Sequence, residues 1–128
     1  MMILTTLDDI AWLLNLRGND IEFNPLFFSY IILHKDGDSY KIDLFINKSK
    51  VEEPEIAKYL SDNHVTVHEY DQVEAMIKEY AAQENKKIVV DVGQCSYRLY
   101  SLLKDNSYEI TEKNGIVEHL KACKNKVQ

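Results

Sequence analysis

Two histidines four residues apart are the first candidates for chemistry in this sequence. His64 and His68 form an H-x-x-x-H pair, and on a helix this spacing would place two imidazoles on one face, as a zinc site requires. The residues between them, Val-Thr-Val, favour a strand, in which four residues span about 13 Å. That separation is too long for one metal ion. We therefore interpret His64 and His68 as surface residues at the two ends of a strand.

A second candidate is segment 91–96, which lies between a predicted strand and a predicted helix, where α/β sheets often bind ligands. Cys95, close to the predicted helix start, could have a thiol of lowered pKa. However, Gly93 is the one glycine of the segment, which is too few for a phosphate loop, and no histidine lies nearby in the sequence to act as a base. We interpret the segment as a capped helix start beside a buried cysteine, and Cys123 as a core residue of the last helix.

The acidic residues have structural explanations. They lie at a predicted helix start (Asp8 and Asp9), in a lead-in to a helix (Glu52 and Glu53) and in a turn (Asp36 and Asp38). No Asp/Glu/His set has the dispersed spacing that a dinuclear metal hydrolase needs. The residues alone therefore predict an α/β domain with no catalytic residue and no metal ligand.

Composition excludes further classes of function. The formal net charge is −6, whereas a protein that binds nucleic acid usually carries a clustered basic face. The longest apolar run, Leu26–Leu33 interrupted by Ser29, is far shorter than the roughly 20 residues that span a membrane. The two cysteines are too few for a disulfide scaffold, and no secretory signal opens the sequence. We expect a cytoplasmic protein that binds neither nucleic acid nor membrane.

The elements that must position any site alternate between strands and helices. A helix is predicted to begin after Thr6, with Arg17 in its last turn and Gly18 as its stop. A β-hairpin is predicted next, from a strand buried on both faces and its antiparallel partner. The remaining predicted helices and strands follow in alternation, and Met1–Thr5 is predicted as an edge strand or the start of one. The predicted ranges are Leu26–Leu33 and Tyr40–Ile46 for the hairpin, then helix 54–62, strand 65–70, helix 71–85 opened by a capping box of Asp71 and Glu74, strand 88–92, helix 96–103, strand 108–111 and helix 116–124. This pattern indicates one α/β domain over residues 1–128, with a mixed sheet and helices on both faces.

One segment is more specific than generic core. Residues 6–20, Thr-Leu-Asp-Asp-Ile-Ala-Trp-Leu-Leu-Asn-Leu-Arg-Gly-Asn-Asp, are followed by Asn-Pro-Leu-Phe-Phe-Ser-Tyr at 24–30. This segment closely resembles the second of the two creatinase/prolidase N-terminal-like domains in three-domain Xaa-Pro aminopeptidases (aminopeptidase P). Weaker similarity continues through 88–103, and residues 120–125 resemble the junction before the catalytic domain of that family.

The resemblance implies a three-layer α/β/α fold of the ribonuclease-H-like type, taken from a longer chain. It implies a parent hydrolase that removes the N-terminal residue preceding proline. In this family a C-terminal pita-bread domain binds two metal ions, usually manganese, through Asp, Asp, His, Glu and Glu. None of these ligands maps onto the present chain. We therefore expect a catalytically inactive domain without a cofactor of its own.

The resemblance also implies partners. These are the pita-bread catalytic domain, a preceding N-terminal domain, peptides with proline at the second position and a possible homodimer. An alternative is a stand-alone or pseudoenzyme module that uses the same fold to bind proteins.

Within the chain, the turn from Arg17 to Asn24 is expected to face the catalytic domain or its substrate, because loops carry function while the flanking helix and strand form the core. The candidate residues are Arg17, Asn19, Asp20 and Asn24. The Arg17 guanidinium could bridge to a carboxylate or to a peptide. Alternatively, Arg17 caps carbonyls of its own helix and Asn24 only organises the turn. The sequence leaves both readings open.

Overall fold

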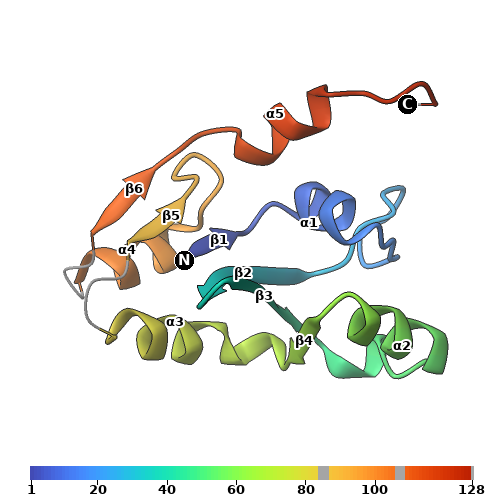
Figure 1. Cartoon of the computed structure of the whole chain (residues 1–128), viewed down its shortest axis with the longest axis horizontal. Coiled ribbons are helices and arrows are strands. Elements are labelled where there is room, and N and C mark those ends of the chain that lie inside the picture. The colour runs from blue at the N-terminus through green and yellow to red at the C-terminus, as the bar shows by residue number, and fades with distance from the viewer. Residues whose placement is uncertain (84–86, 106–108, 128) are drawn as a thin grey trace.

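The structure is a computed structural model that describes residues 1–83, 87–105 and 109–127. Its described elements alternate along the chain much as predicted (Figure 1). In order they are β1 (Met2–Leu4), α1 (Leu7–Leu14), β2 (Ser29–Asp36), β3 (Ser39–Ile46), the 3₁₀ turn η1 (Lys48–Lys50), α2 (Pro54–Asp62), β4 (Val65–His68), the 3₁₀ turn η2 (Tyr70–Gln72), α3 (Val73–Ala81), β5 (Ile88–Val90), α4 (Tyr97–Asp105), β6 (Ile110–Glu112) and α5 (Ile116–Ala122).

The strands form one mixed sheet in the order β4-β3-β2-β1-β5-β6. The hairpin of β2 and β3 pairs in antiparallel register from Ser29↔Ile46 to Asp36↔Ser39, which confirms the predicted hairpin. β2 is also antiparallel to β1, whereas the other neighbours pair in parallel. Five strands therefore run in one direction and β2 runs against them.

The placement of β1 at an edge was wrong. β1 lies between β2 and β5, and its residues Ile3 and Leu4 are buried. Their side chains point to opposite faces of the sheet and join different hydrophobic clusters. A three-residue strand is too short for its sequence to show whether one or both of its edges are paired.

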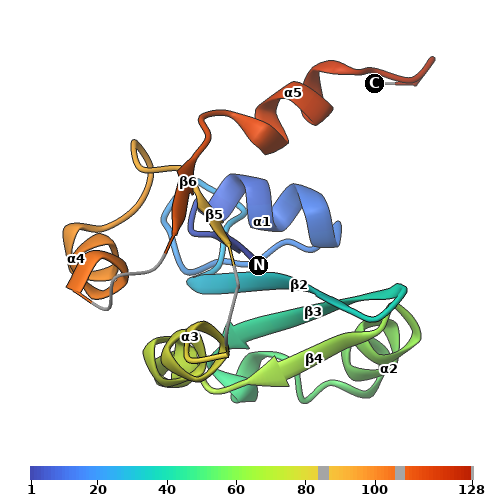
Figure 2. The ribbon, with the colours of Figure 1, turned by 60° about the vertical axis from the view of Figure 1, so that its left-hand side comes forward.

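Helices cover both faces, which confirms the three-layer α/β/α arrangement. α1, α2 and α5 contribute Ile10, Leu60 and Val117 to the core on one face. α3 and α4 contribute Ile77 and Leu103 to the core on the other. Figures 1 and 2 show α1 and α5 together on one side of the strands and α3 on the opposite side. All of these side chains are at most 3% exposed, so both layers are packed against the sheet.

Local signals explain some element boundaries and correct others. Pro54 occupies the first turn of α2, as predicted. The predicted capping box of Asp71 and Glu74 was wrong, since the box is formed by Glu69 and Gln72, which begin η2 ahead of α3. The other predicted ranges hold to within a few residues, except that residues 84 and 85 of a predicted helix and residue 108 of a predicted strand lie outside the described residues.

Candidate functional site

The segment between α1 and β2 lies at the edge where the five codirectional strands end. β2 begins at this edge, because it runs against its neighbours. In open α/β sheets, ligands bind outside the carboxyl ends of the strands. The predicted turn from Arg17 to Asn24 is therefore on the side of the sheet where a functional site is expected.

The end of α1 differs from the prediction. The helix ends at Leu14, and Asn15 follows in the left-handed conformation (φ 50°, ψ 38°). Asparagine tolerates this conformation better than most residues and commonly ends helices in this way. Arg17 and Gly18 thus lie beyond the helix. The run 10–14 is apolar on nearly every side, so its periodicity gave no indication of where the helix stops.

Arg17 contacts the helix that it follows. Its Nη1 donates hydrogen bonds to the carbonyl of Ala11 at 3.0 Å and to that of Leu16 at 2.8 Å. The Ala11 carbonyl belongs to the last turn of α1, so Arg17 makes the capping contact that the sequence left as one of two alternatives. The residue is also exposed and lines a cavity of about 240 Å³ together with Asn19 and Asp20.

Gly18 has a packing role in the turn. A Cβ at Gly18 would stand 2.7 Å from the Cβ of Phe27 and 3.1 Å from the Leu26 carbonyl oxygen. The Gly18 amide donates to the carbonyl of Pro25 at 3.2 Å, and the Asp20 amide donates to that of Leu26 at 3.0 Å. The two sides of the turn are therefore held together by backbone hydrogen bonds at a distance that only glycine permits.

The Asp20 carboxylate fixes the base of the turn. It accepts a hydrogen bond from the Phe28 amide at 2.7 Å and forms an ion pair with Lys50 of η1. Lys50 and the Phe28 amide hold the pKa of Asp20 below its ordinary value of 3.8. The turn is thereby tied to the segment that follows β3.

Asn24 organises the tip of the turn. Its side-chain Nδ2 donates to the carbonyl of Glu22 at 3.2 Å, and its backbone amide donates to that of Ile21 at 3.1 Å. These bonds place Phe23 at the tip with φ of 64°, a conformation that is rare and strained for an aromatic residue. Phe23 is 95% exposed. Sequence reasoning missed Phe23, although an isolated aromatic residue within a polar turn was a usable signal.

A buried polar cluster under α3 was also missed. Asp43 of β3 is 5% exposed, and its Oδ2 accepts a hydrogen bond from the Tyr80 hydroxyl at 3.0 Å. His68 Nε2 lies 2.7 Å from Asp43 Oδ1, and His34 Nδ1 lies 3.3 Å from Asp43 Oδ2. His68 also stacks on Phe45, with ring centroids 5.0 Å apart. The interpretation of His68 as a surface residue was therefore wrong, whereas His64 is exposed just before β4 as expected.

Segment 91–96 serves local structure. The Asp91 carboxylate accepts hydrogen bonds from the amides of Gly93 (3.0 Å) and Gly115 (2.9 Å), which ties this loop to the start of α5. The Ser96 Oγ accepts a hydrogen bond from the Leu99 amide at 3.3 Å and so caps the start of α4, as predicted. Burial, together with the Asp91 charge, raises the pKa of the half-buried Cys95 thiol, the opposite of an activated cysteine.

Cys123 is exposed rather than buried, because α5 ends at Ala122 and leaves Cys123 beyond the packed face. Within α5, the Lys121 ammonium forms ion pairs with Asp8 at 2.8 Å and with Asp9 at 3.1 Å. The paired acids at the start of α1 thus bind α5 to α1.

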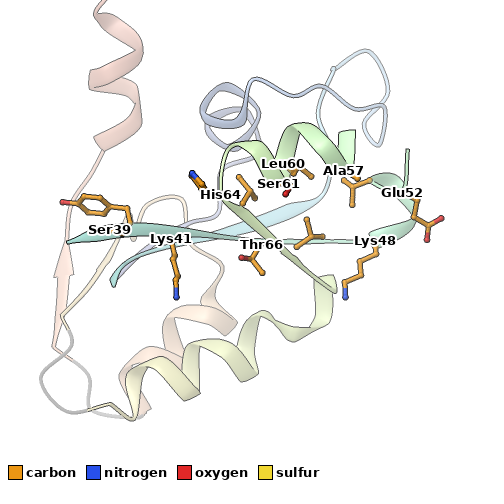
Figure 3. A pocket seen from close by; sticks show the side chains of 13 residues that line it. Ser39, Lys41, Lys48, Glu52, Ala57, Leu60, Ser61, His64 and Thr66 are labelled. Carbon is orange, nitrogen blue, oxygen red and sulfur yellow. The ribbon is translucent and has the colours of Figure 1, made fainter. Parts of the chain in front are cut away.

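A separate hollow of about 820 Å³ lies at the edge strand β4, between β4 and α2. Figure 3 shows its charged side chains, Lys41, Lys48 and Glu52, spread along the hollow rather than directed at one point. It therefore lacks the convergent polar groups of a catalytic pocket.

Within the described ranges, no group of three or more His, Cys, Asp or Glu side chains could hold a metal ion. None of the described helices is long and apolar enough to cross a membrane.

Comparison with known proteins gives consistent matches along the whole sequence. The family model for the creatinase/prolidase N-terminal domain matches residues 1–128. Xaa-Pro aminopeptidase 2 of Rattus norvegicus is 35% identical over 129 residues, which cover 97% of this chain and 18% of that protein. Xaa-Pro aminopeptidase 1 of Dictyostelium discoideum is 32% identical over 128 residues, which cover 100% of this chain and 19% of that protein.

Among solved structures, X-prolyl aminopeptidase from Caenorhabditis elegans, described as a cytosolic enzyme with a di-nuclear active site, superimposes with a TM-score of 0.76 at 27% identity. The match covers 98% of this chain and 20% of that one. The chain thus spans about one fifth of the length of the relatives that it matches.

Proposed function

The chain belongs to the creatinase/prolidase N-terminal domain family, and from this premise we propose that it is the non-catalytic middle domain of an Xaa-Pro aminopeptidase. The parent hydrolase would remove the N-terminal residue that precedes proline. One observation carries this proposal. Proteins named as Xaa-Pro aminopeptidases match nearly the whole of this chain, while the chain matches only about a fifth of the length of each of them.

The proposed division of labour places the chemistry outside this chain. The related nematode enzyme is described as having a di-nuclear active site, and no metal-binding group of side chains occurs in the described residues of this chain. Two metal ions, manganese by family resemblance, would be held by a C-terminal catalytic domain. This domain would then act as a scaffold that limits access to the catalytic site.

The turn from Arg17 to Asn24 is the surface proposed to face the catalytic domain or its substrate. Hydrogen bonds at Gly18, Asp20 and Asn24 hold the turn in one shape, and a preordered loop loses little entropy on binding. Its exposed residues Arg17 and Asn19 and the aromatic tip Phe23 would make the contacts. Aromatic and arginine residues frequently supply most of the binding energy at interfaces.

The same proposal includes the other partners. A preceding N-terminal domain and a second copy of the parent would share the remaining surface, and the parent would act in the cytoplasm, where the nematode relative is described to act. The strongly exposed Leu120 and Val127, near the end of the chain, are available for such contacts.

The proposal is tested with the full-length protein and manganese, by measuring release of the first residue from a peptide with proline at the second position. We expect hydrolysis by the full-length protein, and a loss of about fivefold or more in kcat/KM for Phe23→Ala, because the tip would contact the catalytic domain or its substrate. Tyr40→Ala is the matched control, since Tyr40 is an exposed aromatic on the far end of β3. Absence of hydrolysis by the full-length protein would favour the alternative of a protein-binding module.

A further inference from the structure

We propose that a groove along the carboxyl edge, lined by Phe28, Tyr30 and Tyr70, binds the downstream part of an extended peptide substrate and favours basic residues there. This inference rests on the proposed function, because that function is what would bring a peptide to this edge. The groove is separate from the turn of residues 17–24, although it begins beside that turn.

Three aromatic side chains form the wall of the groove. Phe28 and Tyr30 are two residues apart where the chain enters β2, so they lie on the same side of the extended backbone. Tyr70 of η2 packs on Tyr30 with ring centroids 5.2 Å apart and the ring planes tilted by 32°. Phe28 remains 51% exposed. A row of exposed and half-exposed rings is the kind of surface to which proline-containing extended peptides bind.

Two neighbouring hollows at this edge share part of their lining. One, of about 540 Å³, is lined by residues that include Phe28, Lys50 and Tyr70. The next, of about 430 Å³, includes Tyr30, Tyr70 and Asp71. They share Tyr70 and Asp71, and Lys50 also lines the cavity beside the turn. A peptide that follows this edge would therefore meet all three rings, with Tyr70 common to both hollows.

The charges of the groove select the peptide. Both cations that line it are already paired, Lys50 with Asp20, and Arg98 with Glu74 through Nε–Oε1 at 2.5 Å and Nη2–Oε2 at 3.2 Å. Asp71 is exposed and makes no ion pair among the described residues.

The Glu69 carboxylate, which accepts a hydrogen bond from the Gln72 backbone amide, adds a second negative charge to the lining. The open charge is thus negative, and it complements a lysine or arginine side chain.

The two tyrosines of the groove hold each other in place through their side chains. Burial, with the neighbouring Tyr30 hydroxyl as a second cause, raises the pKa of Tyr70 to about 12. The Tyr70 hydroxyl keeps its proton and is already engaged by the Tyr30 side chain, so the two tyrosines present a fixed pair of rings to the peptide.

The test is a titration of the ¹⁵N-labelled chain with two synthetic peptides, Ala-Pro-Pro-Gly-Lys-Lys and its analogue with two glutamates in place of the lysines. We expect saturable amide shifts at Phe28, Tyr30 and Tyr70 with a Kd on the order of 1 mM or tighter for the lysine peptide. The glutamate peptide should bind at least about fivefold more weakly.

Two exposed substitutions should weaken binding of the lysine peptide without unfolding the chain. Phe28→Ala should raise its Kd about fivefold or more, and Asp71→Asn about two- to fivefold. The matched controls are Tyr40→Ala and Asp38→Asn, which remove an exposed ring and an exposed carboxylate outside the groove. The spectrum of each variant also reports whether it is folded.

The inference is overturned if neither peptide shifts the groove signals at several millimolar, if both peptides bind equally, or if the groove and control variants behave alike. Hydrolysis by the full-length protein is measured separately. Hydrolysis without groove binding would reject only this inference, and absence of hydrolysis would reject the proposed function whatever the titration shows.

Discussion

Replacement of Asp43 by alanine should cost this chain a substantial part of its stability. The Asp43 carboxylate is 5% exposed and is the acceptor for Tyr80 at 3.0 Å and the partner of His68 at 2.7 Å. Removing one member of a buried polar pair costs about 3–5 kcal/mol, because the partners stay buried without compensation. The His68 side chain is 19% exposed, so water relieves part of that cost. We therefore expect a loss of about 3 kcal/mol and a fall in Tm of about 10 °C.

Urea unfolding monitored by circular dichroism measures this change. Asp43→Asn keeps the shape and one acceptor oxygen but places a donor NH₂ beside either His68 or Tyr80, so it should cost about 1–2 kcal/mol. The matched control is Asp38→Asn, which changes an exposed turn residue and should stay within about 0.5 kcal/mol of wild type. A value for Asp43→Ala within that same range would refute the claim that this carboxylate holds α3 and β4 together.

Three further outcomes are expected. Gly18→Ala should destabilise the chain by about 1–3 kcal/mol in thermal unfolding, because its new methyl would meet the Cβ of Phe27 at 2.7 Å; an unchanged Tm would contradict the packing described for the turn. The pKa of Asp20 is lowered from 3.8, so its contribution to stability is full above that value and is lost as the pH falls through the lower folded-state pKa. Wild type should therefore lose more stability than Asp20→Asn between about pH 5 and pH 2, and equal losses would contradict the ion pair at the base of the turn. A thiol-reactive dye at mildly alkaline pH should modify Cys123 before Cys95, since Cys123 is exposed and burial raises the pKa of Cys95; equal rates would contradict this assignment.

Local patterns predicted the elements well where a glycine or proline marks a turn or a helix start. The turn around Gly37 and the β-branched runs on either side of it were sufficient for the hairpin, and Pro54 was sufficient for the start of α2. Where no proline or glycine marks a boundary, the predicted end of an element differed from the structure. The end of α1 was misplaced because Arg17 and Gly18 form an ordinary helix stop in sequence, while the chain leaves the helix earlier, at Asn15.

Features that depend on distant residues could not be predicted. Asp43 alternates with apolar neighbours as an outward-facing strand residue would, and only the placement of α3 over that face buries it. His68 and Tyr80, its partners, come from elements that are 25 and 37 positions away in the chain. In the same way, the aromatic groove depends on Tyr70 meeting Tyr30 across the end of the sheet. Neither pairing has a signal in local sequence.

The most direct test of the central claim compares two preparations in one assay. The purified chain of 128 residues and the full-length protein are each incubated with manganese and a peptide that has proline at the second position, and release of the first residue is measured. We predict hydrolysis by the full-length protein and none by the chain. Metal-dependent turnover by the chain itself, or an inactive full-length protein, would contradict the proposal that this is the non-catalytic domain of an Xaa-Pro aminopeptidase.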